Sequence, residues 1–79
     1  MSTWKQASIL RYLLRCEARG EGAMTVSEIA ETVGRSPSAV RDMLITLCAD
    51  IKVERVGHAG NSRTYGLTDR GRDEAGTIA

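Results

Sequence analysis

Hydrophobic side chains recur at intervals of three and four residues through the first part of the chain. This spacing puts them on one face of a helix and predicts a helix over residues 4–19. Thr3 and Gln6 have the spacing of a capping box at its start. Gly20-Glu21-Gly22 ends the helix, because glycine adopts the left-handed conformation of many helix ends. The apolar stripe consists of Trp4, Ile9, Leu10, Leu13, Leu14 and Cys16.

A second helical pattern follows a very short strand, which we predict at Ala23 and Met24. Thr25 and Glu28 form another capping box, in which each residue satisfies a backbone N–H of the other. This box opens a helix over residues 26–33. Its apolar positions are Val26, Ile29, Ala30 and Val33.

A third helix is predicted directly after a tight turn. Gly34 interrupts the pattern, and Ser36 with Pro37 restarts it, since serine caps helices and proline suits the first helical position. The sequence has a small residue at 30, where two helices cross, and a glycine four residues later. This is the spacing of a helix-turn-helix, here over residues 25–49. An ordinary helical hairpin fits the same pattern. The third helix covers residues 37–49, with Val40, Leu44 and Leu47 on one face and Met43 at its edge.

Strand-like segments at residues 53–56 and 63–67 flank a turn-rich loop over 57–62, which predicts a β-hairpin. Such a hairpin is only marginally stable alone, so it must pack on the helices. Thr68 then caps a short helix over residues 69–75. The fold class is therefore α+β, a single domain over residues 1–79 in which three helices carry a hairpin of two or three strands. The expected core is Ile9, Leu13, Ile29, Ala30, Val33, Val40, Leu44, Leu47, Tyr65 and Leu67.

The stretch from Tyr65 to Gly71 reads Tyr-x-Leu-Thr-x-x-Gly. It resembles the end of the wing and the start of the next helix in MarR-like regulators of the winged helix-turn-helix superfamily. Residues 28–43 are similar to the helix-turn-helix of the same proteins, so the resemblance covers residues 24–76. One helix before this region and a short one after it favour a minimal regulator of the pilus-operon or phage type, with no small-molecule effector.

The resemblance implies that the helix over residues 37–49 enters the major groove of double-stranded DNA. The wing, residues 53–67, then reaches the adjacent backbone or minor groove. Serines near a helix start can donate to phosphate. The guanidinium group of Arg41 can donate two hydrogen bonds to a guanine. Asp42 is interpreted as solvated surface or as a hydrogen-bond acceptor for cytosine. The candidates on the helix and turn are Arg35, Ser36, Ser38, Ala39, Arg41, Asp42, Ile45 and Thr46, and those on the wing are Arg55, His58, Asn61, Ser62 and Arg63.

The net charge of +1 does not by itself indicate a nucleic-acid partner. A DNA-binding function therefore rests on charge placement, and the arginines at 35, 41, 55 and 63 are predicted to share one face. The alternative is a winged-helix module that binds protein and not DNA, because a fold does not dictate its use. The main hypothesis is sequence-specific binding by a small prokaryotic or phage transcriptional regulator. We expect a monomer or weak homodimer, with pairing favoured on DNA.

The sequence offers no arrangement typical of an enzyme or a cofactor site. We find no nucleophile with a base, no paired carboxylates and no phosphate loop. Cys16 and Cys48 with one histidine do not make a zinc site, and both are predicted to be buried, reduced thiols. No apolar run is long enough to span a membrane and no signal peptide is recognisable, so the expected compartment is the cytoplasm.

Overall fold

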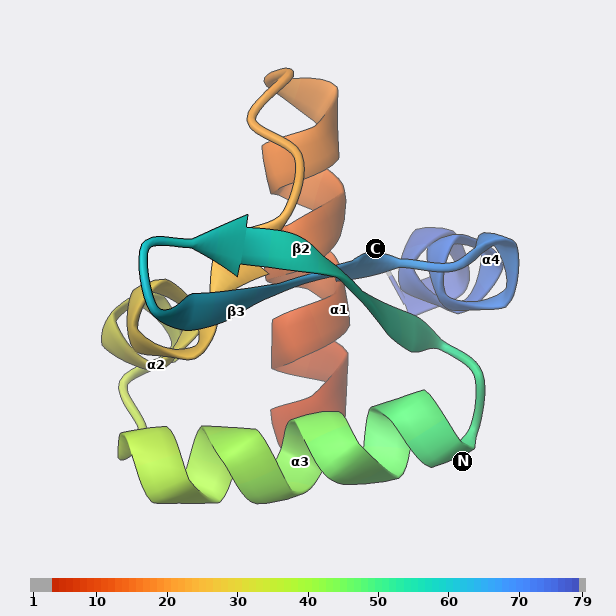
Figure 1. Ribbon diagram of the computed structural model, residues 1–79. Coiled ribbons are helices and arrows are strands. Elements are labelled where there is room, and N and C mark those ends of the chain that lie inside the picture. Colours follow the sequence, from red (N-terminus) through yellow and green to blue (C-terminus); the bar gives the residue numbers. More distant parts are fainter. Residues whose placement is uncertain (1–3, 79) are drawn as a thin grey trace.

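The computed structural model describes residues 4–78, and side chains over residues 6–77. Three helices form the body of the molecule, and a small antiparallel sheet packs against them (Figure 1). In Figure 1, α1 runs behind the sheet, α3 crosses below it, and α2 and α4 lie on opposite sides. The elements are α1 (Trp4–Ala18), β1 (Met24–Thr25), α2 (Val26–Val33), α3 (Pro37–Ala49), β2 (Val53–Ala59), β3 (Ser62–Leu67) and α4 (Asp69–Ile78).

The sheet has the strand order β1-β3-β2, so the hairpin of β2 and β3 is joined to the helical body through β1. Met24 pairs with Tyr65, and Thr25 pairs with Thr64. The register of the hairpin shifts between Arg55 and Gly57, as in a β-bulge. β1, although very short, therefore covers one edge of β3 and links the hairpin to the helical body.

The predicted core is confirmed except at one position. The core combines the apolar face of α3 with residues of α1, α2 and β3. The buried residues of these three elements include Ile9, Leu13, Ile29, Tyr65 and Leu67. Val33 is only half-buried and packs against this core from the end of α2. Further buried positions are Leu10, Cys16, Met24, Val53 and Ala75. The α+β winged helix-turn-helix architecture follows from this packing.

The hairpin differs from the expectation, because the predicted loop over residues 57–62 is wrong. Gly57, His58 and Ala59 continue β2 and pair with β3, which begins at Ser62. Gly60 has a φ of 63° at the start of the tight turn that remains. A glycine at the first central position of a two-residue turn matches the twist of the two strands and keeps their pairing intact up to the turn. The wing is therefore longer and more regular than its composition indicated.

The helix ends were also partly mispredicted. α1 ends at Ala18 and not at Arg19, and β1 is Met24–Thr25 and not Ala23–Met24. α4 continues to Ile78, beyond the predicted end at residue 75. Ala75 is fully buried, so core packing anchors the predicted end of α4, and the helix continues beyond this residue. The capping box expected at Thr3 lies outside the described residues.

The junction of α3, the wing and α4 explains the Thr-x-x-Gly part of the sequence motif. The Thr68 N–H donates to the Lys52 carbonyl oxygen at 3.1 Å, and the Thr68 hydroxyl donates to the Ile51 carbonyl oxygen. The same hydroxyl oxygen accepts from the Gly71 N–H at 3.1 Å. A Cβ on Gly71 would overlap the Lys52 carbonyl oxygen and lie 2.8 Å from its carbonyl carbon. Thr68 and Gly71 therefore fix α4 against the loop between α3 and β2.

Candidate nucleic-acid interface

The turn between α2 and α3 is fixed by local interactions that the sequence predicted. The Thr25 hydroxyl accepts from the Glu28 N–H at 3.2 Å, and the Glu28 carboxylate accepts from the Thr25 N–H at 2.9 Å. Gly34 ends α2 in the left-handed conformation, with a φ of 72°. The Ser36 hydroxyl oxygen then accepts from the Ala39 N–H at 3.2 Å and starts α3. These interactions fix both ends of α2 and the start of α3, whose outer face is exposed.

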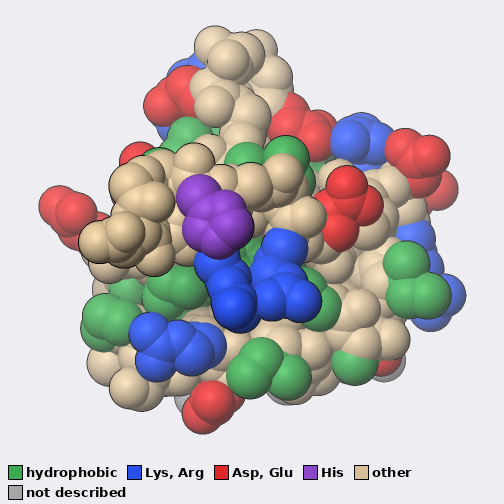
Figure 2. Space-filling view, in the orientation of Figure 1, with side chains coloured by type: hydrophobic (Ala, Val, Ile, Leu, Met, Phe, Trp, Pro, Cys, Tyr) green, Lys and Arg blue, Asp and Glu red, His purple; other side chains and the backbone are tan. Residues whose placement is uncertain are grey.

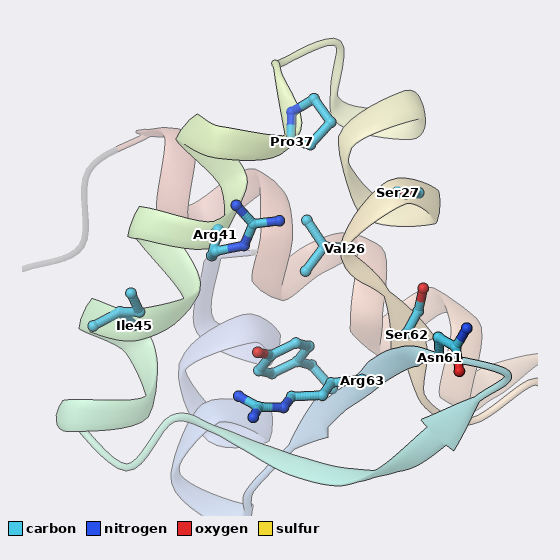
Figure 3. A pocket seen from close by; sticks show the side chains of 9 residues that line it. Val26, Ser27, Pro37, Arg41, Ile45, Asn61, Ser62 and Arg63 are labelled. Atoms are coloured by element: carbon cyan, nitrogen blue, oxygen red, sulfur yellow. The ribbon is translucent and has the colours of Figure 1, made fainter.

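A hollow of about 400 Å³ lies between the start of α2, the outer face of α3 and the tip of the wing. Figure 3 shows Arg41 extending from α3 toward Val26 at the start of α2, and Arg63 extending from β3 toward α3. Two arginine side chains from different elements therefore line one hollow. It is lined by Val26, Ser27, Pro37, Arg41, Ile45, Asn61, Ser62, Arg63 and Tyr65.

A second hollow of about 270 Å³ continues the first along the sheet. It is lined by Ile45, Cys48, Arg55, Arg63 and Tyr65, three of which also line the first hollow. We call the two together the α3–wing groove. Its charged lining residues are Arg41, Arg55 and Arg63, and no acidic residue lines it.

The register of the hairpin explains why these side chains share a face. Directly opposed residues of an antiparallel pair point to the same side of the sheet. Arg55 lies opposite Tyr65, and His58 lies opposite Arg63. Because Tyr65 is buried against the helices, this side of the hairpin faces α3. Figure 2 shows Lys and Arg side chains gathered between the hairpin and α3, next to the one histidine of the chain.

Several acidic side chains are paired away from this groove, which reconciles a basic groove with a net charge of only +1. On α1 and α4, Glu17 accepts from Arg72 at 2.9 and 2.8 Å, and Arg72 also contacts Asp69 at 2.6 Å. The Arg72 guanidinium holds the pKa of the Glu17 carboxyl below its ordinary value. Further pairs are Lys52–Glu74 at 2.8 Å and Arg19–Glu21 at 2.6 Å.

The structure brings together only some of the residues that the sequence singled out. Arg41, Ile45, Asn61, Ser62 and Arg63 line the first hollow, and Arg55 lines the second. The remaining candidates on α3 and its turn line neither hollow. They are Arg35, Ser36, Ser38, Asp42 and Thr46, all of which are exposed, and the half-buried Ala39.

The candidate residues also differ in the hydrogen bonds that they form. Ser36 uses its oxygen as a helix cap, which leaves its hydroxyl hydrogen able to donate. The Thr46 hydroxyl donates to the Asp42 carbonyl oxygen at 3.3 Å. On the wing, His58 is exposed on β2 rather than in a loop.

Sequence reasoning missed Val26, Ser27, Pro37 and Tyr65 as lining residues. Ser27 stands in the first turn of α2, where backbone N–H groups lack helical partners and the helix dipole favours an anion. The capping box at Thr25 was the available signal, because it located this helix start. That the start of α2 faces the wing tip depends on the tertiary fold.

Cys48 lies in the second hollow, half-buried rather than buried as predicted, whereas Cys16 is buried. Partial burial raises the pKa of the Cys48 thiol above its ordinary value. Within residues 4–78, no group of three or more His, Cys, Asp or Glu side chains is placed to hold a metal ion. In the same part of the chain, none of the helices has the length and apolar character needed to cross a membrane.

Comparison with protein families gives one match. The model described as the IclR helix-turn-helix domain matches residues 6–50, which is more than half of the chain. The matched region runs from α1 to the end of α3 and so contains the whole helix-turn-helix. No curated protein matches the chain in sequence.

Several solved structures have the same fold. MepR from Staphylococcus aureus, solved as a complex with DNA, superposes with a TM-score of 0.83 at 24% identity, over 96% of this chain and 60% of that one. RV1404 from Mycobacterium tuberculosis gives a TM-score of 0.81 at 26% identity, over 96% and 50%. A variant of ZitR from Lactococcus lactis gives 0.82 at 25%, over 98% and 50%. The chain therefore spans about half the length of these proteins.

Proposed function

The chain belongs to the family of IclR helix-turn-helix domains, and from this we propose that it binds double-stranded DNA through the α3–wing groove and acts in transcriptional regulation. The observation that carries the proposal is the lining of that groove. Arg41, Arg55 and Arg63 come from three different elements, and no carboxylate lies among them. A groove of this charge fits a polyanion. The proposed function is binding without catalysis.

The dimensions of α3 support entry into the major groove. Its 13 residues make a helix about 20 Å long. A helix with its side chains is about 10–12 Å across, and the major groove is about 12 Å wide. The outward side chains at 38, 42 and 46 are small or of medium size, so they do not hold the helix away from the base edges. Arg41 is then within reach of a guanine, whose O6 and N7 match its fork.

We assign the flanking residues to the phosphate backbone. Val26 and Ser27, in the first turn of α2, line the groove at one end, and the Ser27 hydroxyl at this helix start suits a phosphate. Ser36 and Ser38 offer hydroxyl groups at the start of α3. On the wing, Arg63 and Arg55 suit a phosphate or a narrow minor groove. We assign Asn61 and Ser62 at the wing tip, and His58 on β2, to contacts along the backbone.

Regulation is the finer part of the proposal. MepR is described as a transcription regulator of a multidrug efflux pump, and this chain has the fold of about half of it. The Tyr65–Gly71 motif adds the resemblance to MarR-like regulators, which supports a small prokaryotic or phage regulator. In such proteins two copies commonly read two half-sites, so we propose a chain that is monomeric or weakly dimeric alone and pairs on DNA.

The test begins with selection of duplexes from a randomised pool by the purified chain. Binding is then titrated by fluorescence anisotropy against the selected duplex and a scrambled one. Arg41→Ala should lower affinity for the selected duplex by about 1–3 kcal/mol and relax the preference at one base pair. Arg63→Ala should weaken both duplexes alike and make the salt dependence shallower by about one counterion.

Arg11→Ala is the matched control, because it removes the same charge from an exposed position on α1 outside the groove. It should change neither the preference nor the affinity by a comparable amount. If Arg41→Ala and Arg63→Ala bind every duplex as the unmodified chain does, while circular dichroism shows them folded, DNA binding through this groove is excluded. The protein-interaction alternative then takes its place.

A further inference from the structure

One large apolar side chain is exposed within the α3–wing groove. Among the side chains of residues 6–77, the exposed large hydrophobic residues are Ile45, Ile51 and Val56, with exposed fractions of 62%, 64% and 59%. Ile51 and Val56 line neither hollow of the groove, whereas Ile45 lines both. Single exposed apolar residues are ordinary on protein surfaces. The position of Ile45, between arginines that suit a polyanion, is what calls for an explanation.

Charge complementarity selects the partner that covers Ile45. Arg41 stands one helical turn before it on the same face of α3, and Arg63 reaches the same hollow from β3. An apolar protein surface would leave these two guanidinium groups unpaired on desolvation, at a high free-energy cost. Duplex DNA satisfies both kinds of group, because its backbone is anionic and its major groove presents one apolar group on the base edges.

That apolar group is the 5-methyl of thymine. We propose that Ile45 contacts a thymine methyl in the major groove and thereby makes the chain prefer thymine at one position of its site. The proposal rests on the proposed DNA-binding function and names the base that this part of the groove reads. The isoleucine side chain has no hydrogen-bond donor or acceptor, so it cannot form a hydrogen bond with the edge of any other base.

The geometry of α3 also limits where this thymine stands. Arg41 and Ile45 are four residues apart, which is about 6 Å along a helix. Successive bases of one strand are about 3.4 Å apart. The thymine read by Ile45 therefore lies within about two base pairs of the guanine read by Arg41. A selected site should contain both bases at this separation.

The experiment replaces thymine by uracil, which keeps the pairing with adenine and removes only the methyl group. Each thymine of the duplex selected by the unmodified chain is changed in turn, and affinity is measured by anisotropy. At one position the unmodified chain should lose about fourfold in affinity, equivalent to about 0.8 kcal/mol for one buried carbon group. Ile45→Ala should bind the thymine and uracil duplexes equally.

Val56→Ala is the control, since it shortens an equally exposed β-branched residue that lies outside the groove. It should show the full fourfold response to uracil. The inference is overturned if no uracil substitution weakens binding, if no thymine is selected, or if Ile45→Ala keeps the response. In these cases the selected duplex still outcompetes the scrambled one, and DNA binding stands. If no duplex is preferred over the scrambled one, the proposed function fails together with the inference.

Discussion

Gly71 and Gly76 stand on the same helix and should respond in opposite ways to a single added methyl group. At Gly71 a Cβ would overlap the Lys52 carbonyl oxygen and lie 2.8 and 3.2 Å from the Lys52 carbonyl carbon and Cα. All of these are backbone atoms, so no side chain can rotate away. At Gly76 no atom lies within 4 Å of an added Cβ. Gly71→Ala must therefore displace α4 from the loop between α3 and β2.

The cost follows from the contacts that hold this junction together. Displacement of α4 lengthens the hydrogen bonds from the Thr68 N–H to Lys52 and from the Thr68 hydroxyl to Ile51. It also lengthens the ion pair of the buried Lys52 with Glu74. Overpacking costs about 1–3 kcal/mol, and each weakened hydrogen bond about 0.5–1.5 kcal/mol. Alanine returns about 1 kcal/mol through its higher helix propensity. We expect a net loss of about 1–5 kcal/mol.

Thermal unfolding followed by circular dichroism measures this difference. For a domain of this size, a loss of 2 kcal/mol lowers the Tm by at least about 8 °C. Gly76→Ala has the propensity gain without the overlap, so it should raise the Tm. A Gly71→Ala variant as stable as the unmodified chain would show that the close approach of α4 to Lys52 is not part of the fold. The same result would remove our explanation of the Thr-x-x-Gly motif.

Three further substitutions test other parts of the packing. Ile51 has a φ of 59° at the end of α3, a conformation that costs a β-branched residue free energy. Ile51→Gly should therefore raise the free energy of unfolding in urea by roughly 0.5–1 kcal/mol; a decrease would contradict the left-handed conformation of residue 51. Ala30, 4% exposed at the α2–α3 crossing, has no room for leucine, so Ala30→Leu should cost about 1–3 kcal/mol in the same assay, and a neutral result would mean that the crossing is loose. The pKa of Glu17 is lowered by Arg72, so its contribution is complete above its unfolded pKa, about 4.3, and is lost as the pH falls through the folded value. The loss of stability on acidification should therefore be smaller in Glu17→Gln, and a Glu17→Gln profile parallel to that of the unmodified chain would refute the pair.

The helix-turn-helix was predictable because its determinants are local in sequence. The Thr25–Glu28 box, Gly34 and the Ser36 cap each act within four residues, and the bounds of α2 and α3 were predicted correctly. The hairpin was less predictable because strand pairing is non-local. Gly57 to Ala59 have weak strand propensity, and they extend β2 only because β3 lies beside them.

The candidate site was also only partly predictable from the sequence. Helical periodicity was enough to place Arg41 and Ile45 on the outer face of α3. It gave no information on which segments would lie across from them, so Val26 and Ser27 were missed. The Glu17–Arg72 pair joins residues 55 positions apart, and it became visible only in three dimensions. The charge separation behind the basic groove depends on such pairs.

The end of α3 departs from the expectation for a local helix end. Helices that end in a left-handed residue usually have glycine there. Ile51 takes this position, with its N–H donating to the Cys48 carbonyl oxygen and the Lys52 N–H donating to the Leu47 carbonyl oxygen. Propensity alone does not predict an isoleucine at such a site. The contacts of Thr68 with the loop on its far side hold it there.

The most direct test of the central claim is to map the DNA contact on the chain itself. Amide chemical shifts of the ¹⁵N-labelled chain are recorded by NMR during titration with the selected duplex. We predict that the largest shifts fall at the start of α2, along the outer face of α3 and on the wing, at residues such as Ser27, Arg41, Ile45 and Arg63. The amides of α1 and α4 around Glu17 and Arg72 should move little. Shifts confined to α1 and α4, or none at a duplex concentration that saturates binding, would contradict the account.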